Sequence, residues 1–158
     1  MKLKRLLWLI VLELLGFWVA ASAQTISPLI GEGGKGRIRG QFTIDNPALQ
    51  PLVASVEARS VSFTKEGGVV SHALDSGVEV QLAETSAKIG AKQRHSFDYT
   101  VKCERLCAVV FQSSSYAGRT KEGMLVRVVL LHFVYLCPDG AKGCREKVRR
   151  SFGIAPGQ

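Results

Sequence analysis

The sequence predicts an all-β protein, an antiparallel β-sandwich of seven to eight strands in a single domain. Apolar residues alternate with polar ones along several short segments, and a period of two is typical of half-buried strands. Gly, Pro, Asn and Asp separate these segments at roughly ten-residue spacing, as in sandwiches. The 158 residues are 46% hydrophobic and 22% charged, which favours one globular domain and leaves no room for a second.

Residues 1–23 read as a signal peptide. A basic start, Met1–Arg5, precedes the apolar run Leu6–Ala20, and Ala21-Ser22-Ala23 is a cleavage site of the small-x-small type. The apolar run is too short to span a bilayer comfortably, so we expect no transmembrane segment after cleavage; an uncleaved anchor is the alternative. Export places the mature chain in the periplasm or outside the cell.

The first strands are expected between Thr25 and Ile44. Thr25–Ile30 contains a proline, which assigns it to a sheet edge. Residues 31–36 form a Gly-rich turn; they also match G-x-G-x-x-G, but a dinucleotide site needs a helix after that loop, and here an alternating β segment follows. Residues 37–44 are that segment, with Ile38, Phe42 and Ile44 on one face.

The middle of the chain predicts three further strands. Pro51 opens a long strand over Leu52–Phe63, and shorter strands are expected at residues 69–74 and 78–82. Residues 84–92 look irregular, with Ile89 as a plug beneath a loop.

The remaining segments end in the longest apolar run. Strands are expected at residues 95–101 and 107–111, then a polar loop over 113–123, then a nearly continuous apolar strand from Met124 to Leu136. The sandwich therefore occupies residues 24–138. Residues 139–158 form a basic tail that is expected to be solvated, and no helix of normal length is expected.

Four cysteines fit an oxidising compartment. Local disulfides, Cys103 with Cys107 and Cys137 with Cys144, are the simplest pairing of the three possible. Free thiols and a metal site are the alternatives, although the spacings C-x3-C and C-x6-C suit zinc poorly.

The order of features resembles the N-terminal immunoglobulin-like domain of PapD-like periplasmic pilus chaperones. The matching features are Ile26-Ser27-Pro28, the strand ending in Ile44-Asp45-Asn46-Pro47, Pro51-Leu52-Val53, the strand Phe97–Val101, and Leu136-Cys137-Pro138 after the long last strand. The resemblance implies an immunoglobulin-like fold and a chaperone of pilus assembly that lends its last strand to a pilin-like client.

Strand addition would use the strand 124–136. The predicted partner-binding residues are Met124, Val126, Arg127, Val128, Leu130 and His132. Both faces of this strand are apolar, so one row enters the core and the other needs a cover. A pilin-like client, the C-terminal tail and a second copy of the chain are the candidates. Self-association through this strand, in a structural or cell-surface protein, is the alternative function.

Two features depart from the resemblance, and no catalytic signature is present. The family has a second domain and holds its client's carboxylate with an Arg on the first strand and a Lys on the last, and Thr25–Ile30 contains no Arg. The histidines and Ser113–Ser115 lack the spacing of a metal or nucleophile site. We expect a binding protein rather than an enzyme, with no cofactor or metal. The net charge of +8 favours anionic partners, but export argues against nucleic acid.

Overall fold

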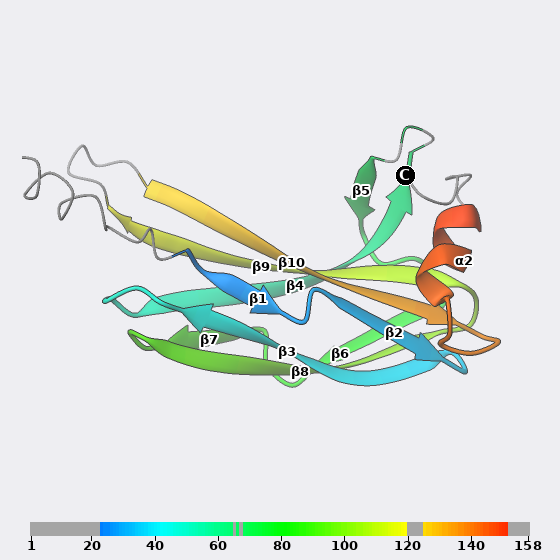
Figure 1. Ribbon diagram of the computed structural model, residues 1–158, viewed down its shortest axis with the longest axis horizontal. Helices are drawn as coiled ribbons and strands as arrows, with labels where there is room; N and C mark the ends of the chain where they lie inside the picture. Colours follow the sequence, from blue (N-terminus) through cyan, green and yellow to red (C-terminus); the bar gives the residue numbers. More distant parts are fainter. Residues whose placement is uncertain (1–22, 65, 67, 120–124, 152–158) are drawn as a thin grey trace, which may run out of the picture.

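The structure is a computed structural model that describes residues 23–64, 66, 68–119 and 125–151 (Figure 1). Its elements are β1 (Thr25–Ser27), β2 (Ile30–Gly34), β3 (Arg37–Asn46), β4 (Leu52–Phe63), β5 (Val69–His72), β6 (Val78–Leu82), β7 (Ser86–Ile89), β8 (Gln93–Cys103), β9 (Cys107–Arg119), β10 (Leu125–Cys137) and the helix α2 (Cys144–Ser151). The predicted all-β class is confirmed.

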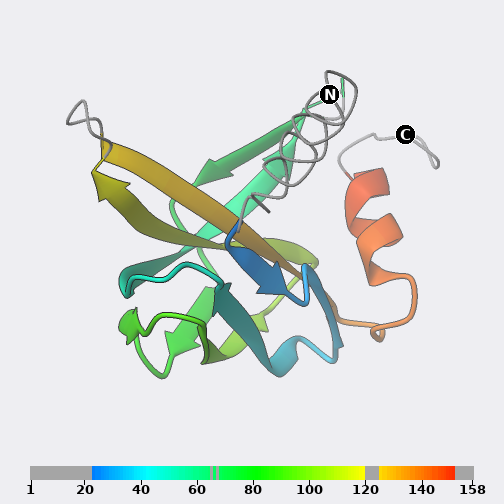
Figure 2. The ribbon, with the colours of Figure 1, turned by 60° about the vertical axis from the view of Figure 1, so that its left-hand side comes forward.

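The strands form one hydrogen-bonded path that curls into two packed layers. Its order is β5-β4-β9-β10-β2-β3-β8-β6, with β1 beside β3 and β7 beside β4. All pairs are antiparallel except β10 with β2, which run parallel between Phe133–Cys137 and Ile30–Gly34. The predicted sandwich is therefore confirmed, with one parallel pair, β10 with β2, that joins the two halves of the path (Figures 1 and 2).

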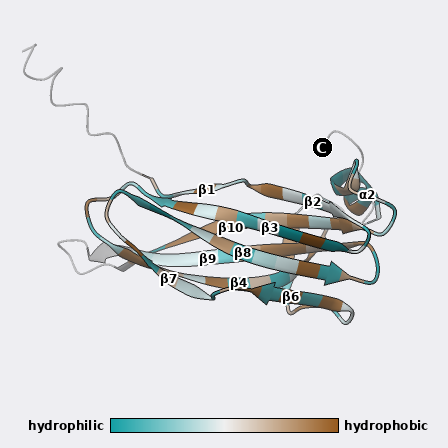
Figure 3. Ribbon diagram, turned by 90° about the horizontal axis from the view of Figure 1, so that it is seen from below, coloured by the Kyte–Doolittle hydropathy of each residue, from teal (hydrophilic) through white to brown (hydrophobic). Residues whose placement is uncertain are grey.

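Alternation along the strands builds the core between the layers. Phe42 and Ile44 of β3, Phe97 and Val101 of β8, and Phe111 of β9 are fully buried or nearly so. Figure 3 shows hydrophobic and hydrophilic residues interleaved along these strands, as the period of two requires. The predicted strands at 37–44, 52–63 and 78–82 are confirmed, and β4 has the predicted bounds.

The predicted Gly-rich turn at 31–36 is wrong, because residues 30–34 form β2. Its glycines let other groups approach the backbone closely. A Cβ at Gly31 would lie 2.8 Å from the Tyr99 hydroxyl, and one at Gly33 would lie 2.7 Å from Ile38 Cβ. The turn itself is confined to Lys35 and Gly36, which both have positive φ.

The predicted polar loop at 113–123 is also wrong over its first part, since β9 continues to Arg119. Ser113 and Ser115 are buried between the layers, where their small side chains fit. β9 lies between β4 and β10, with Ser115 opposite both Ala54 and Val128. Serine alone is a poor strand former, and pairing on both sides overrides this preference.

The segment 84–92 contains a strand, β7, that the sequence did not indicate. Ile89 is buried at 1% exposure, as expected of the plug. Next to it the buried Asn46 side chain donates from Nδ2 to the carbonyls of Gln50 and Gly90, both at 2.9 Å, and accepts at Oδ1 from the Ala48 N–H. This amide holds together the loops that follow β3 and β7.

The tail forms a helix, α2, instead of remaining wholly solvated. Cys144 and Val148 lie one turn apart and are both fully buried. They pack on Tyr135 and Cys137 of β10, in a second apolar cluster with residues of β4 and β9. The basic side chains Arg149 and Arg150 occupy the last turn, where the helix dipole favours them.

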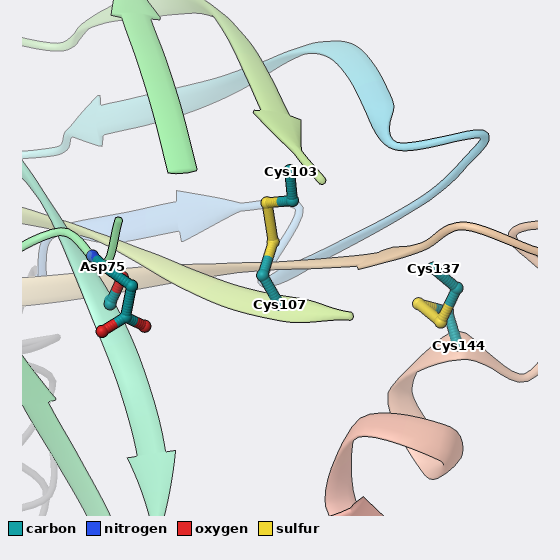
Figure 4. Close-up of a disulfide and its surroundings, with 6 residues drawn as sticks. Asp75, Cys103, Cys107, Cys137 and Cys144 are labelled. Atoms are coloured by element: carbon teal, nitrogen blue, oxygen red, sulfur yellow. A yellow bond between two sulfur atoms is a disulfide. The ribbon is translucent and has the colours of Figure 1, made fainter. Parts of the chain in front are cut away.

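The predicted disulfide pairing is confirmed. Cys103–Cys107 closes the turn between β8 and β9, and Cys137–Cys144 ties the end of β10 to α2, with Cα–Cα distances of 6.4 and 5.6 Å (Figure 4). The described residues contain no free cysteine. The alternatives of free thiols and a metal site are excluded for these four residues.

Candidate strand-addition edge on β10

The last strand is paired on both sides over only part of its length. β9 pairs with β10 from Leu125 to Leu136, whereas β2 pairs only with Phe133–Cys137. In the part of the chain that the structure describes, residues 125–132 therefore have a strand neighbour on one side only. Figure 2 shows this β9–β10 hairpin projecting beyond the other strands.

The N–H and C=O groups of successive β10 residues point alternately towards β9 and towards the open side. The Phe133 N–H donates to the Leu29 carbonyl at 2.9 Å, so it points away from β9. Backbone groups of successive strand residues point to opposite sides, and the β9–β10 register shifts only between Leu125 and Val126. The N–H and C=O groups of Arg127, Val129 and Leu131 therefore face the open edge.

The even-numbered side chains of β10 face the space between the layers. His132, Val134 and Leu136 are fully buried, Leu130 and Val128 are half-buried, and Val126 is 41% exposed. The burial decreases towards the tip of the hairpin because the hairpin projects past the opposite layer. Of the predicted partner-binding residues, Val126 and Val128 have accessible side chains, while Met124 lies outside the described residues.

His132 does not belong to the partner-binding surface, which corrects the expectation for this residue. Its Nδ1 lies 2.7 Å from the Pro28 carbonyl oxygen and its Nε2 lies 3.0 Å from the Tyr99 hydroxyl. Because the carbonyl can only accept, Nδ1 carries the proton, and the Tyr99 O–H donates to Nε2. Residues of β10, β8 and the β1–β2 corner are thereby joined across the core.

Burial keeps this hydrogen-bonded chain neutral. It lowers the pKa of His132, against the opposing effect of the Pro28 hydrogen bond, and it raises the pKa of Tyr99 to about 12. The rings of Phe42 and Phe111 flank the imidazole at centroid distances of 5.1 and 6.0 Å. A sequence pattern of alternating residues did not distinguish this buried histidine from an exposed one.

The odd-numbered side chains of β10 face outward. The C-terminal tail, one of the three candidates for the cover, covers one end of this row, where α2 packs on Tyr135 and the partly buried Phe133 adjoins the same cluster. Further along, Val129 and Leu131 are 48% and 37% exposed, and Arg127 is exposed. This part of the outer row of β10 is therefore accessible, and it lies beside the backbone edge for which the described strands provide no partner.

The remaining ionisable groups do not assemble into a second site. His72 pairs with Asp75 at 3.0 Å, and His95 pairs with Glu84, both at the surface. Within the described ranges, no three His, Cys, Asp or Glu side chains are arranged to hold a metal ion. No helix in the same ranges has the length and apolarity of a membrane span.

Solved structures of fimbrial chaperones share this arrangement of strands. The class 5 fimbriae chaperone CfaA matches with a TM-score of 0.57 and 8% identity, over 74% of this chain and 57% of that one. The complex of the Salmonella enterica SafA pilin with the SafB chaperone matches with a TM-score of 0.56 and 10% identity, over 82% and 61%. The fold is PapD-like. The resemblance expected from the sequence is thus confirmed for the fold.

The PapD-like fold also occurs outside fimbrial systems. SSP-19, an MSP-domain protein like family member in Caenorhabditis elegans, matches with a TM-score of 0.51 and 6% identity, over 72% of this chain and 98% of that one. The chain spans less than two thirds of the length of the fimbrial proteins above. No family model and no curated protein matches the sequence.

Proposed function

We propose that this protein is an exported binding module that holds a protein client by β-strand addition along residues 125–132 of β10. The observation that carries the proposal is that, among the described residues, this segment pairs with β9 alone, while β2 pairs with residues 133–137. Unpaired edge backbone is a template for another strand. The two disulfides and the signal-like segment support a periplasmic or secreted location.

Both the backbone and the side chains of the segment suit this role. Arg127, Val129 and Leu131 present their N–H and C=O groups to the edge, and each added hydrogen bond contributes about 0.5–1.5 kcal/mol. Val126 and Val128 extend past the opposite layer and would enter the apolar core of the client. Binding, rather than catalysis, is the activity that these residues support.

A pilin-like subunit is the client that we propose. The similar proteins include a chaperone in complex with a tip adhesin and another in complex with a pilin. The family resemblance requires an Arg on the first strand and a Lys on the last for the client's carboxylate. β1 contains no Arg, and the β10 residues 125–137 contain no Lys. The client would therefore be held mainly by the strand itself.

Amide hydrogen exchange tests the proposal residue by residue. Candidate pilin-like proteins are co-expressed, and exchange is compared between the free protein and the co-purified complex. The amides of Val126, Val128 and Leu130 are already paired with β9 and should be protected in both states. Those of Arg127, Val129 and Leu131 should become protected only in the complex, and unchanged exchange at these three amides contradicts strand addition.

Two substitutions separate the contributions of backbone and side chain. Val129→Pro removes an N–H that faces the open edge and leaves the β9 ladder intact, so it should weaken the complex. Val128→Glu places a charge in the row that enters the client and should also weaken it. Val53→Glu, on the exposed face of β4, is the matched control that should have no effect.

Self-association through the same strand is the second candidate function. The exposed Val126, Val129 and Leu131 beside an open edge favour it, because such edges pair with copies of themselves. Light scattering of the purified protein distinguishes the two. A stable oligomer without client, with protection of the same three edge amides, supports self-association.

A further inference from the structure

The outer face of β10 forms the floor of an apolar groove of about 560 Å³. Val129, Leu131 and Phe133 line the floor, and Tyr135 lies at its end. Leu29 and Ile30, next to the β1–β2 corner, form one wall, and Phe63 and Val69 form the other. The volume lies in the range of small-molecule sites.

One end of the groove is cationic. Arg145 and Arg149 lie four residues apart on α2, hence on the same side of the helix, and both line the groove. Both also act on the Tyr135 hydroxyl, since their charges lower its pKa against the effect of burial. Glu32 acts on Tyr135 in the opposite sense and raises its pKa.

The apolar side chains that line the groove favour an aliphatic ligand over an extended peptide. The side chains of the floor and walls away from α2 carry no hydrogen-bonding group, so an extended peptide lying on them would bury unpaired backbone groups at a cost. An aliphatic chain has no such groups. From Val129 to Tyr135 the floor is roughly 20 Å long, at about 3.3 Å per strand residue.

We propose that the groove binds a long-chain fatty acid, with the carboxylate at Arg145 and Arg149 and the aliphatic chain along Val129, Leu131 and Phe133. Carboxylates pair well with arginine, and the phenol of Tyr135 is a further donor. This inference does not rest on strand addition, because it concerns the outer face of β10 rather than its backbone edge.

Calorimetric titration of the purified protein with palmitate and with hexadecanol, both delivered from cyclodextrin, tests the proposal. The two ligands share a chain length and differ in charge. We expect saturable palmitate binding at one site and about tenfold weaker binding of hexadecanol, the loss expected for one charge-assisted hydrogen bond. Equal affinities, or no saturable binding, overturn the proposal.

Variants locate the ligand. The double variant Arg145→Gln with Arg149→Gln should bind palmitate as weakly as hexadecanol, whereas Arg150→Gln on the exposed side of α2 should bind it normally. Val69→Asp in the wall should weaken both ligands, and Val53→Asp, which is equally exposed outside the groove, should weaken neither. Equal effects of Val69→Asp and Val53→Asp indicate nonspecific adsorption and overturn the assignment.

Folding of each variant is checked by its urea midpoint. If the double variant fails to fold, the ratio of the affinities of the unaltered protein for palmitate and for hexadecanol still shows whether the ligand's charge contributes to binding. Strand addition is measured by edge amide exchange with a protein client, so a negative result with palmitate leaves that proposal standing.

Discussion

Gly31→Ala tests the close packing around the Tyr99 hydroxyl. The new methyl carbon would lie 2.8 Å from that oxygen, well below the 3.4 Å at which ordinary contacts begin. Tyr99 would have to move, and its hydrogen bond to His132 Nε2, now 3.0 Å, would be distorted. Gly31 is not among the residues with positive φ, so alanine is compatible with the backbone itself.

The magnitude follows from two opposing effects. Overpacking in a core costs about 1–3 kcal/mol, and the reduced freedom of the unfolded chain returns about 0.4–1 kcal/mol. The two effects together give a destabilisation between about 0 and 2.6 kcal/mol, with a central value of about 1 kcal/mol. In a Tyr99→Phe background the nearest atoms are Val134 Cγ2 at 3.6 Å and His132 Nε2 at 3.7 Å, which are ordinary contacts. There the same substitution should be neutral or stabilising by up to about 1 kcal/mol.

Urea unfolding of the four proteins of this double-mutant cycle, followed by circular dichroism, measures both values. Tyr99→Phe alone should cost about 1–3 kcal/mol, because His132 Nε2 loses its donor. The reasoning is refuted if Gly31→Ala costs the same free energy of unfolding in both backgrounds.

Three further predictions concern the other polar and covalent links. Burial lowers the pKa of His132 in the folded state, so below about pH 6.5 the unfolded chain binds a proton that the folded protein does not bind. The urea midpoint should therefore decrease as the pH is lowered below about 6.5, and it should decrease less steeply in His132→Gln. Asn46→Asp places a carboxylate against three carbonyl oxygens and should cost about 3 kcal/mol or more, whereas a loss below that of Asn46→Ala in the same assay would contradict this reading. Replacing Cys137 and Cys144 by Ser should cost about 2 kcal/mol and speed trypsin cleavage within α2, and an unchanged cleavage rate would show that packing alone holds the helix.

The long alternating strands could be predicted because their burial follows directly from the period of two. Pro51 marks the start of β4, and its buried row Leu52, Ala54 and Val56 alternates with exposed residues. Elements built from small residues could not be predicted. Gly31 in β2 and Ser115 in β9 are poor strand formers, and their small size fits the groups that pack against them. Such tertiary contacts leave no periodic signal in the sequence.

The sequence indicated which strand forms the candidate site, but not which of its side chains are exposed. A strand apolar on both faces, Met124–Leu136, indicates a docking role without indicating which row is internal, so His132 was assigned to the wrong surface. The helix α2 escaped prediction because its eight residues carry only Cys144 and Val148 as buried anchors. One turn's spacing between two small residues is too little to identify an amphipathic helix.

The bridge between Cys137 and Cys144 makes maturation of the molecule depend on its surroundings. In a reducing compartment the two thiols stay unbonded, and α2 is held to β10 by the connecting turn and by the packing of Cys144 and Val148 on Tyr135. In an oxidising compartment, such as the one that we propose for this protein, the bridge would fix the helix with Arg145 and Arg149 over the end of β10. The two arginines would thus be fixed beside the groove on the outer face of β10 only in the compartment where the proposed ligand would bind.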